Sequence, residues 1–241
     1  LKNGFTDKQV KFATSRAINS GAYVGAQATV KEMRKVFDRP TPWILKSVRY
    51  TKSTKDNLKA EIDFDFWGNK QGVTASQVLQ AEIFGGQRNL KRHEKALQRA
   101  GILPVGKAIV PGSAAMIDQY GNMSAGQIVQ VMAWFKGFGQ QGYKANIDDK
   151  GRKRLGRDKK KTGQKGFQYF AMQAKRGKLI RGVYQRFQTG FGSAVKPVMV
   201  FVERPKYKAR LDFYGIAERE ARKEFNSKTS QYYAEAVRTA K

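Results

Sequence analysis

Three acidic residues, Glu61, Asp63 and Asp65, recur at every second position in one stretch of the chain. Carboxylates of this kind can hold Mg²⁺ for the cleavage of a phosphodiester, and a basic protein surface would suit that substrate. Their spacing favours another role. Alternate residues of a strand lie in a row about 7 Å apart, whereas a nuclease needs carboxylates that converge from different elements. Pairing with cations such as Lys46 or Arg49 is the simpler interpretation, so a metal-dependent nuclease is the weakest of three functional hypotheses.

The other residue types that carry chemistry are scarce. The sequence has no cysteine, which excludes disulfides, thiolate metal sites and cysteine nucleophiles. Its one histidine, His93, lies among basic residues within 88–99, and these cations disfavour the protonated imidazole, so we expect a surface or capping role. The glycine-containing runs 68–72, 137–142 and 190–192 match neither a Walker nor a dinucleotide-binding pattern. We therefore expect no catalytic residue, no metal and no cofactor.

The longest basic run lies within residues 148–166 and reads KGRKRLGRDKKKTGQKG at its centre. It has no apolar periodicity, which predicts a mobile loop inserted into the fold. Lys and Arg without interleaved aromatic residues suit contacts to a phosphate backbone, not base reading. Docking on an acidic protein surface and plain solvation remain the alternatives. The residues assigned to a polyanion or acidic partner are Lys150, Arg152, Lys153, Arg154, Arg157, Lys159, Lys160, Lys161 and Lys165.

The composition also indicates a polyanionic or acidic partner. The 241 residues include 47 Lys and Arg against 19 Asp and Glu, a formal net charge of +28. Solubility alone does not need such an excess, so a polyanion or an acidic protein surface is the expected partner. A hydrophobic fraction of 40% and an aromatic fraction of 12% predict a globular chain. No apolar run approaches the roughly 18 to 20 residues that cross a bilayer, and the start is too polar for a signal peptide, so no membrane is expected.

A long helix is predicted over residues 7–37, capped by Thr6 and stopped by the prolines that follow. Small residues recur along it at every fourth position, which would let a neighbouring backbone approach closely. Internal glycines weaken a helix by about 1 kcal/mol each, so a packing contact should require them. A core helix and a close contact between elements or subunits both fit this stripe. Its members are Ala13, Ala17, Gly21 and Gly25.

The middle of the chain predicts a mixture of short elements. Strands over 44–52 and 58–67 should form a hairpin, and a short element should follow over 75–84. We expect Asn89 to cap a helix that runs to Ala100. The proline- and glycine-rich segment 102–112 predicts an irregular ordered loop.

The last part predicts a helix, a sheet and a final helix. Ser124 and Gln127 have capping-box spacing ahead of a helix over 125–138. Strands are expected over 167–173, 178–187 and 195–203. Asp212 should cap a final helix to about residue 240, which carries apolar residues four apart. Together these elements predict a single α+β domain over residues 1–241, with the two long terminal helices packed on an antiparallel sheet and a basic insertion at 148–166.

Several segments resemble a known group of proteins. The helix KQVKFATSRAINSGAYVGAQATVKEM resembles the start of the phage minor tail protein Z and tail-completion families, with their A-I-N step at Ala17, Ile18 and Asn19. QAEIFGGQR at 80–88 resembles their acid-then-glycine turn, and PVMVFVERPKY their late strand before a terminal helix. GILPVGKAIVPGSAAMIDQYGNMSAGQIVQ is similar to segments of phage proteins from virion-structure gene clusters. The resemblance covers the two ends and part of the middle.

The resemblance implies a virion protein without catalysis, assembled in the host cytoplasm as a ring in the head-to-tail connector, neck or tail-completion region. Its partners would be further copies of itself, portal or connector proteins and tail proteins, with non-specific contact to genomic DNA. The alternative is a sequence-independent DNA-binding protein, for which +28 is the argument. Packing between subunits is assigned to small and aromatic residues of the two terminal helices: Ala13, Ala17, Gly21, Gly25, Phe213, Ala217 and Phe225.

Overall fold

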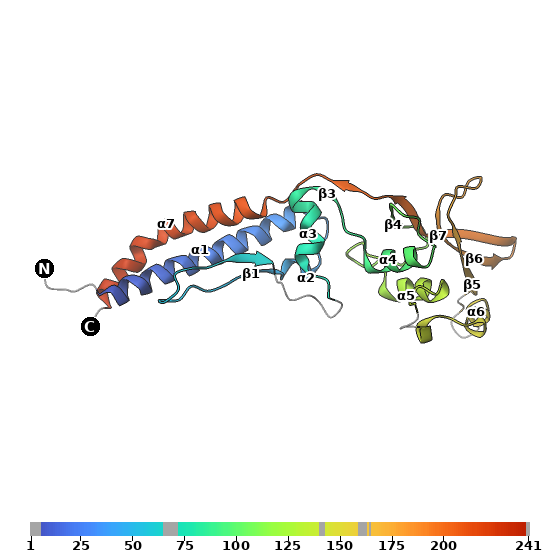
Figure 1. The fold of residues 1–241 in the computed structure, drawn as a ribbon, viewed down its shortest axis with the longest axis horizontal. Helices are drawn as coiled ribbons and strands as arrows, with labels where there is room; N and C mark the ends of the chain where they lie inside the picture. The colour runs from blue at the N-terminus through green and yellow to red at the C-terminus, as the bar shows by residue number, and fades with distance from the viewer. Residues whose placement is uncertain (1–5, 65–71, 140–142, 159–162, 164, 240–241) are drawn as a thin grey trace. The chain divides into compact units, whose positions relative to one another are not determined.

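The computed structural model describes residues 6–64, 72–139, 143–158, 163 and 165–239 (Figure 1). The chain divides into two compact units: unit 1 comprises Leu1–Gly86 and Tyr207–Lys241, and unit 2 comprises Gln87–Lys206. The long helices α1 and α7 pack together, and the paired strands of the three sheets that the structure describes include a four-stranded antiparallel sheet, so the predicted α+β class is confirmed. Compactness does not measure independent folding, so the single domain over 1–241 stays a prediction. In the described chain, no helix is both long and apolar enough to span a bilayer.

Unit 1 is built on two long helices, α1 (Asp7–Val36) and α7 (Phe213–Arg238), which run antiparallel to each other (Figure 1). Both predicted N-caps are confirmed. At the start of α1, the Gln9 side-chain oxygen accepts a hydrogen bond from the Thr6 backbone N–H at 2.9 Å. At the start of α7, the Asp212 carboxylate accepts one from the Gly215 backbone N–H at 3.0 Å. Because these caps satisfy backbone donors that the helices leave open, they fix where each helix begins.

The predicted hairpin of unit 1 is present but shorter. Strands β1 (Val48–Tyr50) and β2 (Ile62–Phe64) pair antiparallel. The expectation of a strand from residue 44 is wrong, because α2 (Pro42–Leu45) occupies that place. Pro42 at the first helical turn presets φ, and the Thr41 hydroxyl accepts a hydrogen bond from the Ile44 N–H at 3.4 Å. The predicted short element at 75–84 is helix α3 (Ala75–Phe84).

The core of unit 1 forms where α1, α3, α7 and the hairpin meet. Phe64 and Phe213 pack with their ring centroids 4.3 Å apart. Beyond the hairpin strands, Asn19 of α1 fixes the following loop: its side chain accepts from the Ser53 N–H at 2.7 Å and donates to the Ser53 carbonyl at 3.0 Å. Further members of this core are Met33, Ile44, Leu45, Leu79 and Leu211.

Unit 2 contains a four-stranded antiparallel sheet in the order β4-β7-β6-β5. The three late strands are confirmed as β5 (Phe167–Met172), β6 (Gly182–Thr189) and β7 (Gly192–Glu203). The irregular loop predicted over 102–112 is wrong, because β4 (Lys107–Pro111) pairs with β7 along its whole length. Proline is tolerated there because β4 is an outer strand that pairs on one side only.

Two helices that pack on this sheet depart from their predicted bounds. Helix α4 (Arg92–Arg99) begins after Lys91, so the predicted cap at Asn89 is wrong; the Glu94 carboxylate accepts from the Lys91 N–H at 2.6 Å and fixes the start instead. Helix α5 (Ala125–Trp134) is capped by Ser124 as expected. It ends four residues early, because Lys136 takes a left-handed backbone with φ of 58°.

The basic insertion is partly helical, so the prediction of a loop over 148–166 is wrong for its first half. Helix α6 (Asp149–Leu155) is capped by Asp148, whose carboxylate accepts from the Gly151 N–H at 2.7 Å. Ile147 packs against Gly151, which is buried. A short 3-10 helix (Tyr143–Ala145) precedes it. The chain passes between the units at two short paired strands, β3 (Gly86–Gln87) and β8 (Lys206–Tyr207).

Candidate functional site

The small-residue stripe of α1 lies against α7 of the same chain. Ala13 and Ala17 are fully buried, and Gly21 and Gly25 are buried with them. A Cβ atom on Gly21 would lie 2.6 Å from the Ala221 carbonyl oxygen, so only glycine permits this approach of two backbones. The sequence assigned the stripe to packing between subunits. The structure places the stripe between two helices of one chain, and its assignment to subunit packing stays a prediction.

The α7 residues assigned to packing between subunits differ in their burial. Phe213 is fully buried in the core and Ala217 is buried against Gly25, whose Cβ would meet its carbonyl oxygen at 2.6 Å. Phe225 is half-buried and lies beside Gly21, close to a shallow pocket. Two polar pairs also join the helices: the hydroxyls of Thr14 and Tyr233 share a hydrogen bond of 2.7 Å, and Arg16 pairs with Glu235 at 2.7 Å.

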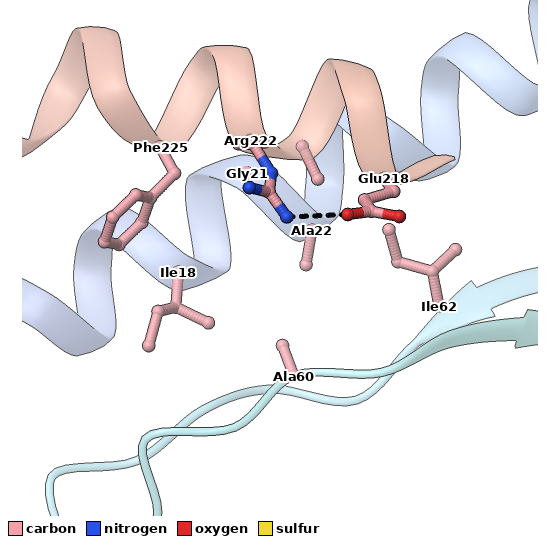
Figure 2. A pocket seen from close by; sticks show the side chains of 9 residues that line it. Ile18, Gly21, Ala22, Ala60, Ile62, Glu218, Arg222 and Phe225 are labelled. Carbon is pink, nitrogen blue, oxygen red and sulfur yellow. Dashed lines mark hydrogen bonds and ion pairs between the residues drawn. The ribbon is translucent and has the colours of Figure 1, made fainter. Parts of the chain in front are cut away.

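Figure 2 shows the pocket of unit 1, which has a volume of about 230 Å³ and opens between α1, α7 and the hairpin. Its lining is apolar except for Glu218 and Arg222, which form an ion pair of 2.6 Å on one turn of α7. Because these two charges satisfy each other, the pocket offers an apolar surface and no reactive group. Its lining residues are Ile18, Gly21, Ala22, Ala60, Ile62, Glu218, Ala221, Arg222 and Phe225.

The carboxylate row behaves as the polar face of a hairpin. Asp63 lies opposite Arg49 in the strand register, and Glu61 forms an ion pair with Lys59. Asp65, like Phe66 beside it, lies outside the described residues. Across the described part of the chain, no group of three or more His, Asp or Glu side chains is placed to hold a metal ion.

A buried ion pair occupies the region around His93. The Glu94 side chain is fully buried, and the Arg88 guanidinium donates two hydrogen bonds to it, at 2.6 and 2.7 Å. The backbone N–H groups of Lys91 and Ile109 donate two more, at 2.6 and 2.7 Å. Burial alone would raise the pKa of Glu94, but the hydrogen bonds from Arg88, Ile109 and Lys91 lower it below its usual value. This network joins α4 to β4, so its role is structural.

Beside this network, burial lowers the pKa of His93 to about 4, with a further contribution from the Lys91 charge. The cation effect expected from the sequence is therefore present, but it is smaller than burial. The imidazole is neutral at pH 7.

The assigned basic residues divide into exposed and anchored side chains. Arg152 is anchored: its guanidinium lies 5.1 Å from the Trp134 ring centroid and donates to the Trp134 carbonyl at 2.8 Å, which holds α6 against α5. Lys165 is exposed and pairs with Asp158 at 3.0 Å. Lys159, Lys160 and Lys161 lie outside the described residues. The remaining exposed cations are Lys150, Lys153, Arg154 and Arg157.

The hairpin of β6 and β7 ends in an exposed aromatic side chain. Phe191 is fully exposed between Gly190 and Gly192. The Thr189 hydroxyl orders this tip, because it accepts from the Phe191 N–H at 3.3 Å and donates to the Gly192 carbonyl at 2.8 Å. Aromatic residues are enriched among those that dominate binding energy at interfaces, so Phe191 is a candidate contact residue.

A second surface feature lies on β5, β6 and the turn between them. We call it the basic groove; it has a volume of about 760 Å³. The Arg186 guanidinium lies 4.9 Å from the Phe170 ring centroid, and Phe170 stacks on Tyr184 with centroids 5.4 Å apart. The groove is lined by Phe170, Ala171, Met172, Gln173, Ala174, Lys175, Arg176, Leu179 and Arg186.

Comparisons with protein-family models, with curated proteins and with solved structures found no match to this chain. The described features that bear on function are an apolar tip and basic surfaces in unit 2, and a tightly packed pair of helices in unit 1.

Sequence reasoning missed the tip, the basic groove and the Arg88–Glu94 pair. A phenylalanine between two glycines at a strand-to-strand turn, at Gly190–Gly192, was a signal for the tip. The groove had a weaker signal, because its cations come from separate positions that only the pairing of β5 with β6 brings together. The Arg88–Glu94 ion pair had no signal in the sequence, because its burial depends on β4, a segment that the sequence predicts to be a loop.

Proposed function

We propose that this chain is a structural protein of a tailed-phage virion, part of the head-to-tail connector, neck or tail-completion ring, which acts by protein–protein packing without catalysis. The observation that carries the proposal is the ordered, fully exposed Phe191. Burying such a side chain stabilises by about 1.5–3 kcal/mol, which becomes available only when a partner covers it. Single exposed aromatic residues at the centre of a contact often dominate its binding energy.

The rest of the molecule supports this proposal. The segments that resemble tail-completion proteins include α1 and the strand β7 that leads toward α7, and the two helices form one tightly packed pair. A further exposed aromatic pair, Phe84 and Tyr214, lies on unit 1 with ring centroids 6.2 Å apart. A net charge of +28 also favours an assembly in which neighbouring proteins supply negative charge.

Two experiments test the proposal. Disruption of the gene in the source phage should give filled heads without tails, and particles with normal tails and infectivity would contradict it. In the purified chain, sedimentation should detect rings, and Phe191→Ser should shift them toward monomer with an unchanged melting temperature. Val105→Ser is the matched control, because Val105 is 86% exposed on another loop of the same unit. Equal effects of both changes would show that the tip has no special role.

A sequence-independent DNA-binding protein is the second candidate, and the exposed cations of α6 favour it. Lys150, Lys153 and Arg154 project from one short helix, and such residues can neutralise phosphates. Gel shifts at rising salt separate the two candidates. A steep loss of affinity for bare DNA by the purified monomer, reduced by Lys150→Ala and Arg154→Ala together, would favour this function over assembly.

A further inference from the structure

The basic groove has an apolar floor and a cationic rim. Its apolar side chains come from Phe170, Met172 and Leu179, which are half-buried. Its cations, Lys175, Arg176 and Arg186, are exposed. No acidic side chain is among the residues that line it. A ligand for this surface must therefore combine apolar side chains with negative charge.

Arg186 is held in place before any ligand arrives. The Phe170 ring stacks on Tyr184 at an interplanar angle of 18°. The Arg186 guanidinium lies 4.9 Å from the Phe170 ring centroid. The Tyr184 hydroxyl donates to the Ile180 carbonyl at 2.9 Å, which fixes the base of the stack to the turn. A guanidinium oriented by an aromatic face keeps its N–H edge available for a carboxylate.

None of the six acidic residues of unit 2 lines the groove, and five of them are engaged elsewhere. Glu94 is bound by Arg88, Glu203 pairs with Lys107, and Asp158 pairs with Lys165. Asp148 caps α6 and Asp118 accepts hydrogen bonds within its own turn. The local positive charge therefore has to be met from outside the unit.

We propose that the basic groove binds an extended acidic segment of a partner protein, in which apolar residues alternate with Asp or Glu. This deepens the assembly function proposed above, because it names the chemistry of one partner. β5 is the last strand in the order β4-β7-β6-β5, so an extended segment can run along its outer edge. Apolar side chains of that segment would cover Met172 and Leu179, and its carboxylates would meet Arg176 and Arg186.

A nucleic-acid strand fits the groove less well. Phosphates would satisfy the three cations, but the apolar side chains of Phe170, Met172 and Leu179 would then face a charged backbone. The aromatic faces are also occupied, since Phe170 carries both Tyr184 and Arg186, so a base would have to displace the guanidinium to stack. The apolar floor thus decides between the two classes of partner.

The test uses a fluorescein-labelled synthetic peptide that alternates leucine with glutamate, titrated by anisotropy against the full chain. Arg186→Ala and Arg176→Ala should each weaken binding about tenfold, as expected when one charged pair is lost. Arg186→Lys should weaken it less, because it keeps the charge and loses the planar fork. Lys178→Ala is the matched control: Lys178 lies in the same turn, is exposed, and does not line the groove.

The apolar half of the site is tested separately. Leu179→Ser should weaken binding of the leucine–glutamate peptide severalfold. If that change lowers the melting temperature, Met172→Gln serves as the second variant. A serine–glutamate peptide should bind poorly to the wild type. If Lys178→Ala weakened peptide binding equally, general positive charge and not the groove would attract the peptide, which would overturn the proposal. Tighter binding of oligothymidylate, unaffected by Leu179→Ser, would assign the groove to nucleic acid instead. Ring formation, read by sedimentation with the groove variants, reports on the assembly function independently.

Discussion

The two units use their residues for opposite purposes. Unit 1 places its small residues where they pack, so that α1 and α7 approach until a single Cβ at Gly21 would clash with backbone. Unit 2 carries most of the excess positive charge, because it holds 25 of the 47 Lys and Arg residues but only 6 of the 19 Asp and Glu residues. Most of those few acids form internal pairs or caps. Unit 1 therefore has the closer approach of two helix backbones, and unit 2 carries the larger excess of positive charge.

The largest effect is expected in unit 2, at its buried charge. Glu94→Ala removes the carboxylate partner of the Arg88 guanidinium and the acceptor of two backbone N–H groups, which should cost about 3–5 kcal/mol of unfolding free energy. Urea denaturation followed by Trp134 fluorescence measures it in a background where Trp43 and Trp67 are replaced by phenylalanine, because Trp134 lies in the core of unit 2 and the other two belong to unit 1. A loss within measurement error would show that solvent replaces the lost partner and that the pair is not structural.

A smaller effect is expected in unit 1. Gly25→Val introduces a Cβ that would lie 2.6 Å from the Ala217 carbonyl oxygen, and overpacking of this kind typically costs about 1–3 kcal/mol. Helical circular dichroism follows it, since α1 and α7 are the longest helices described. If Glu94→Ala and Gly25→Val shift two separate transitions, the units unfold independently. One shared transition would support the single domain predicted from the sequence.

Acid should weaken the two units unequally. The pKa of Glu94 is lower in the folded chain than its ordinary value of 4.5, so the unfolded chain binds the proton more tightly. The stability from this pair is therefore complete above about pH 4.5 and is lost as the pH falls through the folded-state pKa. Unfolding curves at descending pH should show the loss in the Trp134 signal, and Glu94→Gln should flatten it. An unchanged slope in that variant would place the acid sensitivity elsewhere.

The smallest effect concerns the cap of α6. Asp148→Ala removes the acceptor of the Gly151 N–H and should cost about 1 kcal/mol. Because the cap holds a helix at the surface, amide exchange within Asp149–Leu155 should accelerate with little change elsewhere in unit 2. Asp149→Ala is the control, since Asp149 follows the cap position. Equal acceleration by both would show that general charge at the helix start, not the cap bond, orders α6.

The sequence predicts elements whose signals are local. The caps at Thr6, Ser124 and Asp212 and the three late strands follow from spacing within a few residues, and all are present. β4 was missed because the prolines and glycines of the segment 102–112 suggest a loop, and only pairing with β7, far along the chain, makes residues 107–111 a strand. The small-residue stripe was recognised, but its partner was not, since a stripe carries no information on which helix meets it. The groove and the tip depend on strand pairing in the same way.

The turn at Phe191 has a consequence for the rate of assembly. Most aromatic contact residues sample several rotamers and backbone states before they dock, and this slows the encounter or shortens the life of the complex. At this hairpin the Thr189 hydroxyl already holds the backbone on both sides of the phenyl ring. The entropy of ordering this backbone is therefore lost during folding and not on docking. Thr189→Val should therefore leave the exposed ring intact and still slow its capture by a partner.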